Sequence, residues 1–295
     1  LQNMVQEDGR IVYEIDFLEN HPSYKSNTVR EMGSAYALAF AYYQTGDKKL
    51  EKSLKNILKQ MEKRCFSFGN YYCFIPESKD KIKVGATALA LLAELYYEQA
   101  SGDFSFSDLR RKMVNALVFS FKDGKGVSAS PFEPDRTSPY YDGETWFALS
   151  VYHLFHPEDQ KVARLLPRMD ETMFNLYQDH YLISFVHWGT MAASHRFQAT
   201  KDRKFVDFLK TQFDLYVQEK PIPDSGSSTC SVSEGLSDIV FFLAEADPDF
   251  AQKVLNRVTE NKKKIEDLQV LSNSVKGEKA EHFPHIHPET RKYIG

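Results

Sequence analysis

Ionisable residues suited to proton transfer recur where Ala-rich segments of the chain begin. Carboxyl groups occur at Asp142, Glu144 and Glu234, and an imidazole at His187. A positioned acid and a positioned base can together transfer protons to and from a reacting group. Because the two groups must converge from different parts of the fold, we expect Asp142 or Glu144 to pair with Glu234, with His187 in the same catalytic site.

Other side chains at equivalent places are suited to holding a ligand. They are Asn27, Arg30, Tyr140, Tyr141 and Trp188. A guanidinium binds a carboxylate through two parallel hydrogen bonds, and aromatic side chains offer flat apolar faces. We expect these five residues to bind substrate.

Each of these residues also has a structural interpretation. Asp142 is a good helix cap, and Glu144 in a first turn is favoured by the helix dipole. Arg30 lies in a largely apolar segment, where a carboxylate on another helix would serve as well as a ligand. His187 can equally be an ordered histidine of the core. Both interpretations stay open, and the same holds for Glu234.

A recurring acidic turn separates the segments that must position these side chains. A stretch rich in small and aromatic residues ends at each turn, and an amphipathic stretch follows. The turns contain Asp47, Asp103, Asp159, Asp202 and Asp247, which lie 56, 56, 43 and 45 positions apart. Periods of this size are typical of stacked or circular helical hairpins. We expect the small-residue helix of each hairpin to lie inside and its amphipathic partner outside.

Apolar spacing predicts the extent of each element. Inner helices are predicted at 27–46, 84–98, 142–155, 188–200 and 231–245, and outer helices at 48–63, 107–121, 159–175, 202–217 and 248–266. A short strand is predicted at 10–16 and a small β-hairpin within 64–83. Residues 268–295 are expected to form an irregular tail with part of a sixth inner helix, and residues 1–295 a single domain.

Composition narrows the functional classes. The 295 residues are 42% hydrophobic and have a formal net charge of −4, which indicates a soluble globular protein. Lys and Arg are not interleaved with aromatic residues, so no nucleic-acid partner is expected. No apolar run approaches the length of a membrane span. The chain opens at Leu1, as a processed chain or an excised domain would, and both a cytoplasmic and a periplasmic location stay open.

Cysteine and histidine patterns give little sign of cross-links or metal. Cys65 and Cys73 could pair across a short loop, but two buried thiols are the favoured interpretation. The spacing of His282, His285 and His287 suits zinc, yet this segment contains proline and lacks a fixed acidic partner. We therefore expect neither a metal nor another cofactor.

Three segments carry a resemblance to a known superfamily. They are NTVREMGSAYALA (27–39), YYDGETWFAL (140–149) and HWGTMA (187–192). Together with the repeated hairpins, they make residues 10–260 resemble the α/α-toroid, or six-hairpin glycosidase-like, superfamily. The resemblance implies an all-α barrel of helical hairpins, five of them clear and the sixth incomplete, with short β-hairpin loops.

The superfamily includes unsaturated glucuronyl hydrolases, sugar epimerases and polysaccharide lyases. The resemblance therefore implies a saccharide ligand in a central cleft, cleaved or rearranged by two carboxyl groups acting as acid and as base or nucleophile. Tyr140, Tyr141 and Trp188 would then stack on sugar rings, and Arg30 would bind a uronic acid. Two alternatives stay open: a non-catalytic binding or scaffold module of the same fold, and an open solenoid that binds protein.

Overall fold

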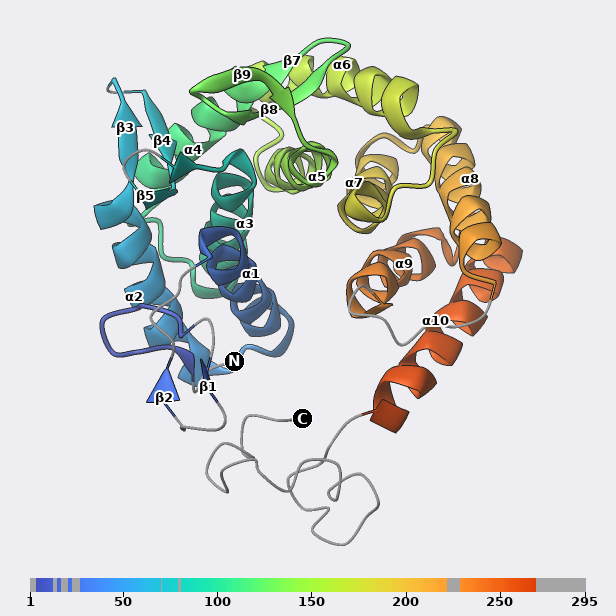
Figure 1. Ribbon diagram of the computed structural model, residues 1–295, viewed down its shortest axis with the longest axis horizontal. Coiled ribbons are helices and arrows are strands. Elements are labelled where there is room, and N and C mark those ends of the chain that lie inside the picture. Colours follow the sequence, from blue (N-terminus) through green and yellow to red (C-terminus); the bar gives the residue numbers. More distant parts are fainter. Residues whose placement is uncertain are drawn as a thin grey trace, which may run out of the picture.

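Ten helices in two layers dominate the computed structural model, which describes residues 4–12, 15–16, 21–22, 27–69, 71–78, 81–221 and 229–268 (Figure 1). The inner helices are α1 (Thr28–Thr45), α3 (Val84–Ser101), α5 (Pro139–Phe155), α7 (Ile183–Thr200) and α9 (Thr229–Leu243). The outer helices are α2 (Lys48–Arg64), α4 (Ser107–Ser120), α6 (Gln160–Tyr177), α8 (Arg203–Glu219) and α10 (Pro248–Leu268).

The inner helices pack side by side in chain order around a common centre. α1 contacts α3, α3 contacts α5, α5 contacts α7, and α7 contacts α9. Each is followed by the outer helix that covers it (Figure 1). The predicted all-α toroid of hairpins is confirmed. The predictions of a partial sixth helix and of a histidine pattern at His282, His285 and His287 fall on residues outside the described part of the chain.

Three of the acidic turns supply the N-cap of an outer helix. Asp47, Asp159 and Asp202 precede α2, α6 and α8, and each carboxylate accepts a hydrogen bond from the backbone N–H two residues later. Asp103 and Asp247 likewise accept a backbone N–H from the segment that follows them. The repeat seen in the sequence is therefore an aspartate that accepts a backbone N–H just after each inner helix, and at α2, α6 and α8 it satisfies donors that the helix leaves unpaired.

Buried ion pairs join inner helices to outer ones. Arg110 of α4 donates to Glu94 of α3 over 3.1 Å and also to Glu98, in a region where every residue from Val84 to Glu98 is buried. Arg196 of α7 donates to Asp170 of α6 through Nε (2.9 Å) and Nη2 (2.7 Å). Each of the two buried guanidinium groups thus has a carboxyl partner, which offsets the cost of burying its charge.

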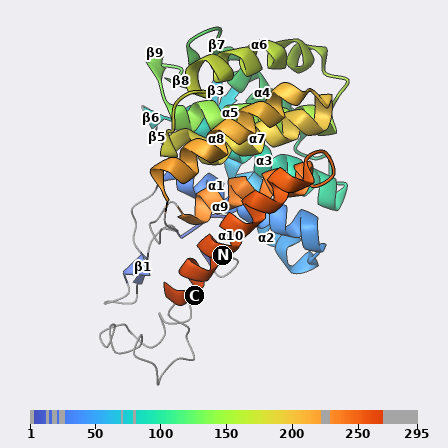
Figure 2. The ribbon, with the colours of Figure 1, turned by 90° about the vertical axis from the view of Figure 1, so that its right-hand side faces the viewer.

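Short strands occupy the connections between hairpins. They are β1 (Ile15–Asp16), β2 (His21–Pro22), β3 (Phe66–Phe68), β4 (Tyr72–Phe74), β5 (Pro76–Ser78), β6 (Lys81–Ile82), β7 (Phe121–Lys122), β8 (Gly126–Ser130) and β9 (Glu133–Thr137). Strands β1–β2, β3–β4 and β5–β6 form antiparallel pairs, and β7, β8 and β9 form a three-stranded sheet. Figure 2 shows β5, β6, β8 and β9 together at one end of the ring, where α3 and α5 begin.

Some predicted boundaries differ from the structure. Helix α5 begins at Pro139, three residues before the prediction, because proline is favoured at the first helical position, where its missing N–H costs nothing. Helix α7 begins at Ile183. Within the range 10–16 predicted as a strand, the described residues include β1 and Ile11, which forms an isolated bridge with Val5. None of the described helices is both long and apolar enough to span a membrane.

The prediction that Cys65 and Cys73 are thiols is wrong, since they form a disulfide. The antiparallel pairing of β3 with β4 places Ser67 opposite Cys73 and brings the two cysteine Cα atoms to 5.4 Å, a normal disulfide separation. The bridge ties the end of α2 to β4. Cys230 on α9 is an exposed free cysteine.

Candidate functional site

Side chains from four inner helices meet in the interior of the ring. The ring of Tyr36 on α1 lies 6.1 Å from that of Phe147 on α5 and 6.0 Å from that of Trp188 on α7, measured between centroids. The Tyr36 hydroxyl lies 3.5 Å from Oε1 of Glu234 on α9. In the row of inner helices α1 packs beside α3, so its contacts with α5, α7 and α9 cross the centre of the ring.

Glu234 is oriented from both sides. Nε2 of His187 lies 3.0 Å from its Oε2, and the Tyr36 hydroxyl donates to its Oε1. The side chain of Glu234 is 44% exposed, whereas that of His187 is only 11% exposed. The carboxylate is therefore held in place yet open to a ligand. The structure thus brings together two of the predicted catalytic residues.

Asp238 supplies a second carboxyl group one helical turn further along α9. The spacing of four residues places it on the same helix face as Glu234. Its Oδ2 lies 3.5 Å from Nδ1 of His195 and has no hydrogen-bond partner among the described residues. Burial, together with the charge of Glu234, raises the pKa of Asp238 to about 8. This carboxyl group is therefore protonated at neutral pH.

The histidine beside Asp238 is neutral. Burial lowers the pKa of His195 to about 4. Its Nδ1 donates to the backbone carbonyl of Met191 over 2.9 Å, which orients the ring. Since the imidazole carries no charge, it does not favour ionisation of Asp238.

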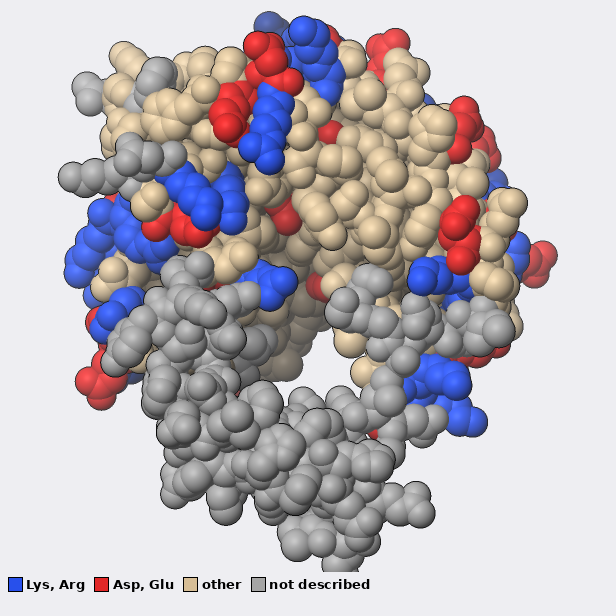
Figure 3. Space-filling model, viewed as in Figure 1, with Lys and Arg blue, Asp and Glu red and all other residues tan. Residues whose placement is uncertain are grey.

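Aromatic rings line the interior next to the carboxyl groups. Trp188 packs with its ring 4.0 Å from that of His187 and stacks on Phe147 at 6.0 Å. The ring centroid of Tyr36 lies 5.9 Å from that of Tyr96. Figure 3 shows that the described surface above the central hollow is largely uncharged, with Asp and Glu atoms at separate points. Of these rings Trp188 is partly exposed, whereas Phe147, Tyr36 and Tyr96 are buried. Trp188 therefore offers an aromatic face to a ligand beside the two carboxyl groups.

Gly235 determines how Glu234 reaches His187. A Cβ at this position would lie 2.6 Å from the carbonyl oxygen of His187 and 2.4 Å from Oγ1 of Thr190. Only glycine allows α9 to approach α7 this closely. The Glu-Gly pair therefore positions the carboxylate next to the imidazole.

Asp142, by contrast, bonds to the outer layer. Its side chain is buried and accepts hydrogen bonds from the backbone N–H of Val127 in β8, over 2.5 Å, and from the hydroxyl of Tyr177 in α6. Burial raises its pKa to about 6, against these two hydrogen bonds. Asp142 thus fastens β8 and α6 to the first turn of α5. Ser138, not Asp142, is the N-cap residue of that helix.

Glu144 is buried between α5 and α3. Its Oε2 has no hydrogen-bond partner among the described residues, and burial raises its pKa to about 8. A Cβ on Gly85, in the first turn of α3, would lie 1.8 Å from this oxygen. The Glu144 carboxyl group therefore packs against the first turn of α3 and not against Glu234. The structure does not bring Asp142 or Glu144 into a contact with Glu234 comparable to that of His187.

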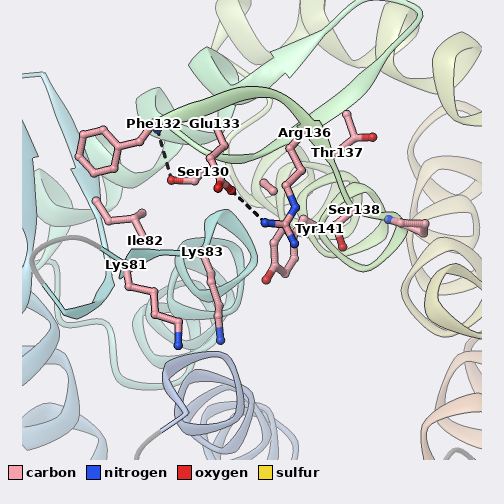
Figure 4. Close-up of a pocket in the computed structure, with 12 residues that line it drawn as sticks. Lys81, Ile82, Lys83, Ser130, Phe132, Glu133, Arg136, Thr137, Ser138 and Tyr141 are labelled. Carbon is pink, nitrogen blue, oxygen red and sulfur yellow. Dashed lines mark hydrogen bonds and ion pairs between the residues drawn. The ribbon is translucent and has the colours of Figure 1, made fainter.

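The remaining predicted binding residues are spread over the ends of two helices. Asn27 is the N-cap of α1, and its Oδ1 accepts the backbone N–H of Arg30 over 3.3 Å. The Arg30 side chain is exposed. Tyr140 is 49% exposed, whereas Tyr141 is partly buried and lines a cavity of about 500 Å3 (Figure 4).

Sequence reasoning missed Asp238, Tyr36 and His195. One signal was available, because Asp238 is an acidic residue four positions after Glu234 in an otherwise largely apolar helix. Likewise, His195 follows His187 by eight positions, about two helical turns. No cluster of three or more His, Cys, Asp or Glu residues with metal-binding geometry occurs in the described part of the chain.

Comparison with known proteins bears on the fold. No family model matches the chain, and no curated protein matches its sequence. The structure is similar to that of a GH76 α-mannanase from Bacteroides thetaiotaomicron, solved as a selenomethionine derivative, with a TM-score of 0.61 and 12% sequence identity over 82% of this chain and 74% of that chain. The likeness shows the α/α-toroid fold.

Proposed function

We propose that this protein is a glycan-active enzyme that cleaves a glycosidic bond in the interior of the ring, with Glu234 and Asp238 as its two carboxyl groups. The observation that carries the proposal is the difference between two carboxyl groups one helical turn apart. Glu234 is exposed and oriented by His187 and Tyr36, whereas Asp238 is desolvated. Glycoside cleavage needs such a division between one protonated and one ionised carboxyl group.

The environments of the two groups suggest their roles. Asp238, with a pKa of about 8, is the general acid that protonates the departing glycosidic oxygen. Glu234 is the carboxylate that activates water or attacks the anomeric carbon, while His187 and Tyr36 hold it in position. Trp188 is the platform on which a sugar ring stacks. We assign the acid to Asp238 and not to Asp142 or Glu144, because the latter two bond to or pack against β8, α6 and α3.

The substrate class rests on two supports. Trp188 is partly exposed and offers a face on which a sugar ring can stack, while the buried rings of Phe147 and Tyr36 pack against it. In addition, the similar toroid described above is an α-mannanase. A shared fold hosts many chemistries, so the carboxyl pair is the stronger support.

The experiment is a screen of neutral and acidic oligosaccharides, with product analysis by mass spectrometry. We expect the wild-type chain to release shorter products from at least one substrate, and Glu234→Gln to release none. Glu245→Gln, an identical substitution in the exposed turn after α9, is the matched control and should behave as wild type. Binding without any product in the wild-type chain would show a non-catalytic module and would contradict the proposal.

A further inference from the structure

A cavity separate from the carboxyl pair lies where α3 and α5 begin. Its volume is about 500 Å3, within the usual range of small-molecule sites. The walls come from β6, β8, β9 and the first residues of α5. Figure 4 shows Lys81 and Lys83 extending side by side from the β6 side and Arg136 extending toward Tyr141 from the β9 side.

The charge around this cavity is predominantly positive. Lys81, Lys83 and Arg136 line it, and the carboxylates that pair with them are Glu77 and Glu133. Among the described residues, three cations thus face two carboxylates. The nearby Glu144 adds no charge at neutral pH, because burial raises its pKa to about 8. The balance favours an anionic group in the ligand.

The cations can exchange their present partners for a ligand. The pair of Arg136 with Glu133 joins side chains that are 73% and 52% exposed, and exposed pairs contribute little to stability. Lys81 and Lys83 share the single carboxylate of Glu77, at 2.9 Å and 2.8 Å. Each ammonium has three donors, so both keep hydrogen-bonding capacity for an anion.

Two helix N-termini add to the positive potential. Helices α3 and α5 begin at this cavity after Lys83 and Ser138, and neither residue makes a side-chain cap hydrogen bond. Amide dipoles at a helix N-terminus favour negative charge nearby. They reinforce the lysine and arginine side chains.

The other walls suit a sugar ring. Tyr141 and Phe132 are aromatic, Ile82 is apolar, and Ser130 offers a hydroxyl group. Aromatic faces pack on the C–H faces of a saccharide, while hydroxyl groups bond to its edges. Figure 4 shows Tyr141 below Arg136, so a ring stacked on the tyrosine could direct an anionic substituent toward the guanidinium.

We propose that this cavity is a binding subsite for a sugar residue that bears an anionic substituent, a carboxylate or a phosphate or sulfate ester. Arg136 and Lys83 bind the anion and Tyr141 packs against the ring. The proposal rests on the proposed function only in taking the ligand to be a saccharide. It deepens that function by naming acidic glycans as the preferred substrate class.

The test is binding of matched monosaccharides to the full chain, measured by titration calorimetry. The probes are glucose, galactose and mannose, each compared with its uronic acid, its 6-phosphate and its 6-sulfate. At least one anionic sugar should bind at least about tenfold more tightly than its neutral parent, because hydrogen bonds to charged groups are strong. Comparison of the uronic acid, the 6-phosphate and the 6-sulfate shows which anionic substituent the cavity binds.

Substitutions then locate the binding. Lys83→Gln and Arg136→Gln should each weaken binding of the preferred anionic sugar by about tenfold or more, and should leave the neutral parent unchanged. Lys125→Gln, which removes one exposed charge in the turn between β7 and β8, is the matched control and should bind like wild type. Unchanged circular dichroism and melting temperature would show that the variants fold.

Two results would overturn the inference. One is equal or undetectable binding of the anionic and neutral sugars, and the other is anionic binding that Lys83→Gln and Arg136→Gln do not weaken. Neither depends on turnover. The proposed function is tested separately by Glu234→Gln. If the protein cleaves only neutral glycans, the proposed anionic subsite is refuted and the catalytic proposal is not.

Discussion

Nε2 of His187 on α7 lies 3.0 Å from Oε2 of Glu234 on α9. This contact joins two inner helices at their N-terminal halves and orients a carboxylate whose side chain is 44% exposed. The close helix approach at Gly235 makes the contact possible. On this account His187 acts through Glu234 as a positioning residue.

Substitution of His187 should therefore reduce turnover more than stability. We expect His187→Ala to lower kcat by on the order of 10-fold to 100-fold, because a misplaced catalytic group reacts slowly. His187→Gln keeps a side-chain N–H donor and should recover part of the loss. Steady-state kinetics should show the effect in kcat and little change in KM. Equal losses in the Ala and Gln variants would contradict a positioning role.

Substitution of Asp142 should reduce stability more than turnover, the reverse of the effect expected for His187. Asp142→Asn offers the Tyr177 hydroxyl and the Val127 N–H a poorer acceptor inside the core. We expect the free energy of unfolding to fall by about 1–3 kcal/mol, with kcat of the folded protein close to that of wild type. Urea denaturation and kinetics on the same sample would check both. A large loss of kcat without loss of stability would instead place Asp142 in the catalytic machinery.

The first turn of α3 should tolerate only glycine at position 85. In Gly85→Ala the new Cβ would lie 1.8 Å from Oε2 of Glu144 and 2.5 Å from Cδ1 of Tyr141. We expect a loss of about 1–3 kcal/mol of unfolding free energy, as for other overpacked cores. The control is Gly33→Ala on α1, whose Cβ would meet Leu89 at an ordinary 3.8 Å and should be neutral or stabilising.

A second substitution in the same chain distinguishes the clash from a general helix effect. Combining Gly85→Ala with Glu144→Ala removes the carboxylate, so the two losses should be less than additive. Additive losses would mean that the two residues do not compete for the same space.

Glu144 should make a contribution to stability that falls as pH rises. Its pKa is about 8 in the folded protein against a reference value of 4.5, because burial disfavours the ionised form. Between these values the native state binds more protons than the unfolded chain, so its stability decreases with pH. The contribution is full below about pH 4.5 and is lost by about pH 8.

Glu144→Gln isolates this contribution from those of Glu94 and Asp238, which burial affects in the same direction. The variant removes the titration, so its stability relative to wild type should increase with pH, by at most about 1.4 kcal/mol per pH unit. Urea denaturation at pH 5 and pH 7.5 measures the difference. Parallel stability curves for the two proteins would refute the assignment.

The hairpin repeat could be predicted from the sequence because the residues that mark it act on neighbouring residues in the chain. An N-cap aspartate acts on backbone N–H groups two or three residues away, so Asp47, Asp159 and Asp202 could be interpreted without the rest of the chain. The amphipathic outer helices and the small-residue inner helices are equally local patterns. The Cys65–Cys73 disulfide depended on the register of a hairpin, and the pattern of residues did not reveal it.

The candidate site was only partly predictable because it depends on which way each helix faces. Asp142 lies about 140° around α5 from Phe147, which faces the ring interior, since each residue turns the helix by about 100°. It therefore points toward β8 and α6. Glu234 and Asp238 lie only about 40° apart on α9 and share a face. Rotations of this kind are set by packing between helices that are distant in sequence.

The most direct test of the account is the kcat/KM of Asp238→Asn and Glu234→Gln on the substrate found in the oligosaccharide screen. We predict a loss of at least about 100-fold in each variant, as expected when a general acid or base is removed, with melting temperatures near that of wild type. Asp214→Asn, an exposed substitution on the outer helix α8, should retain wild-type activity. Values of kcat/KM close to wild type in both site variants would contradict the account.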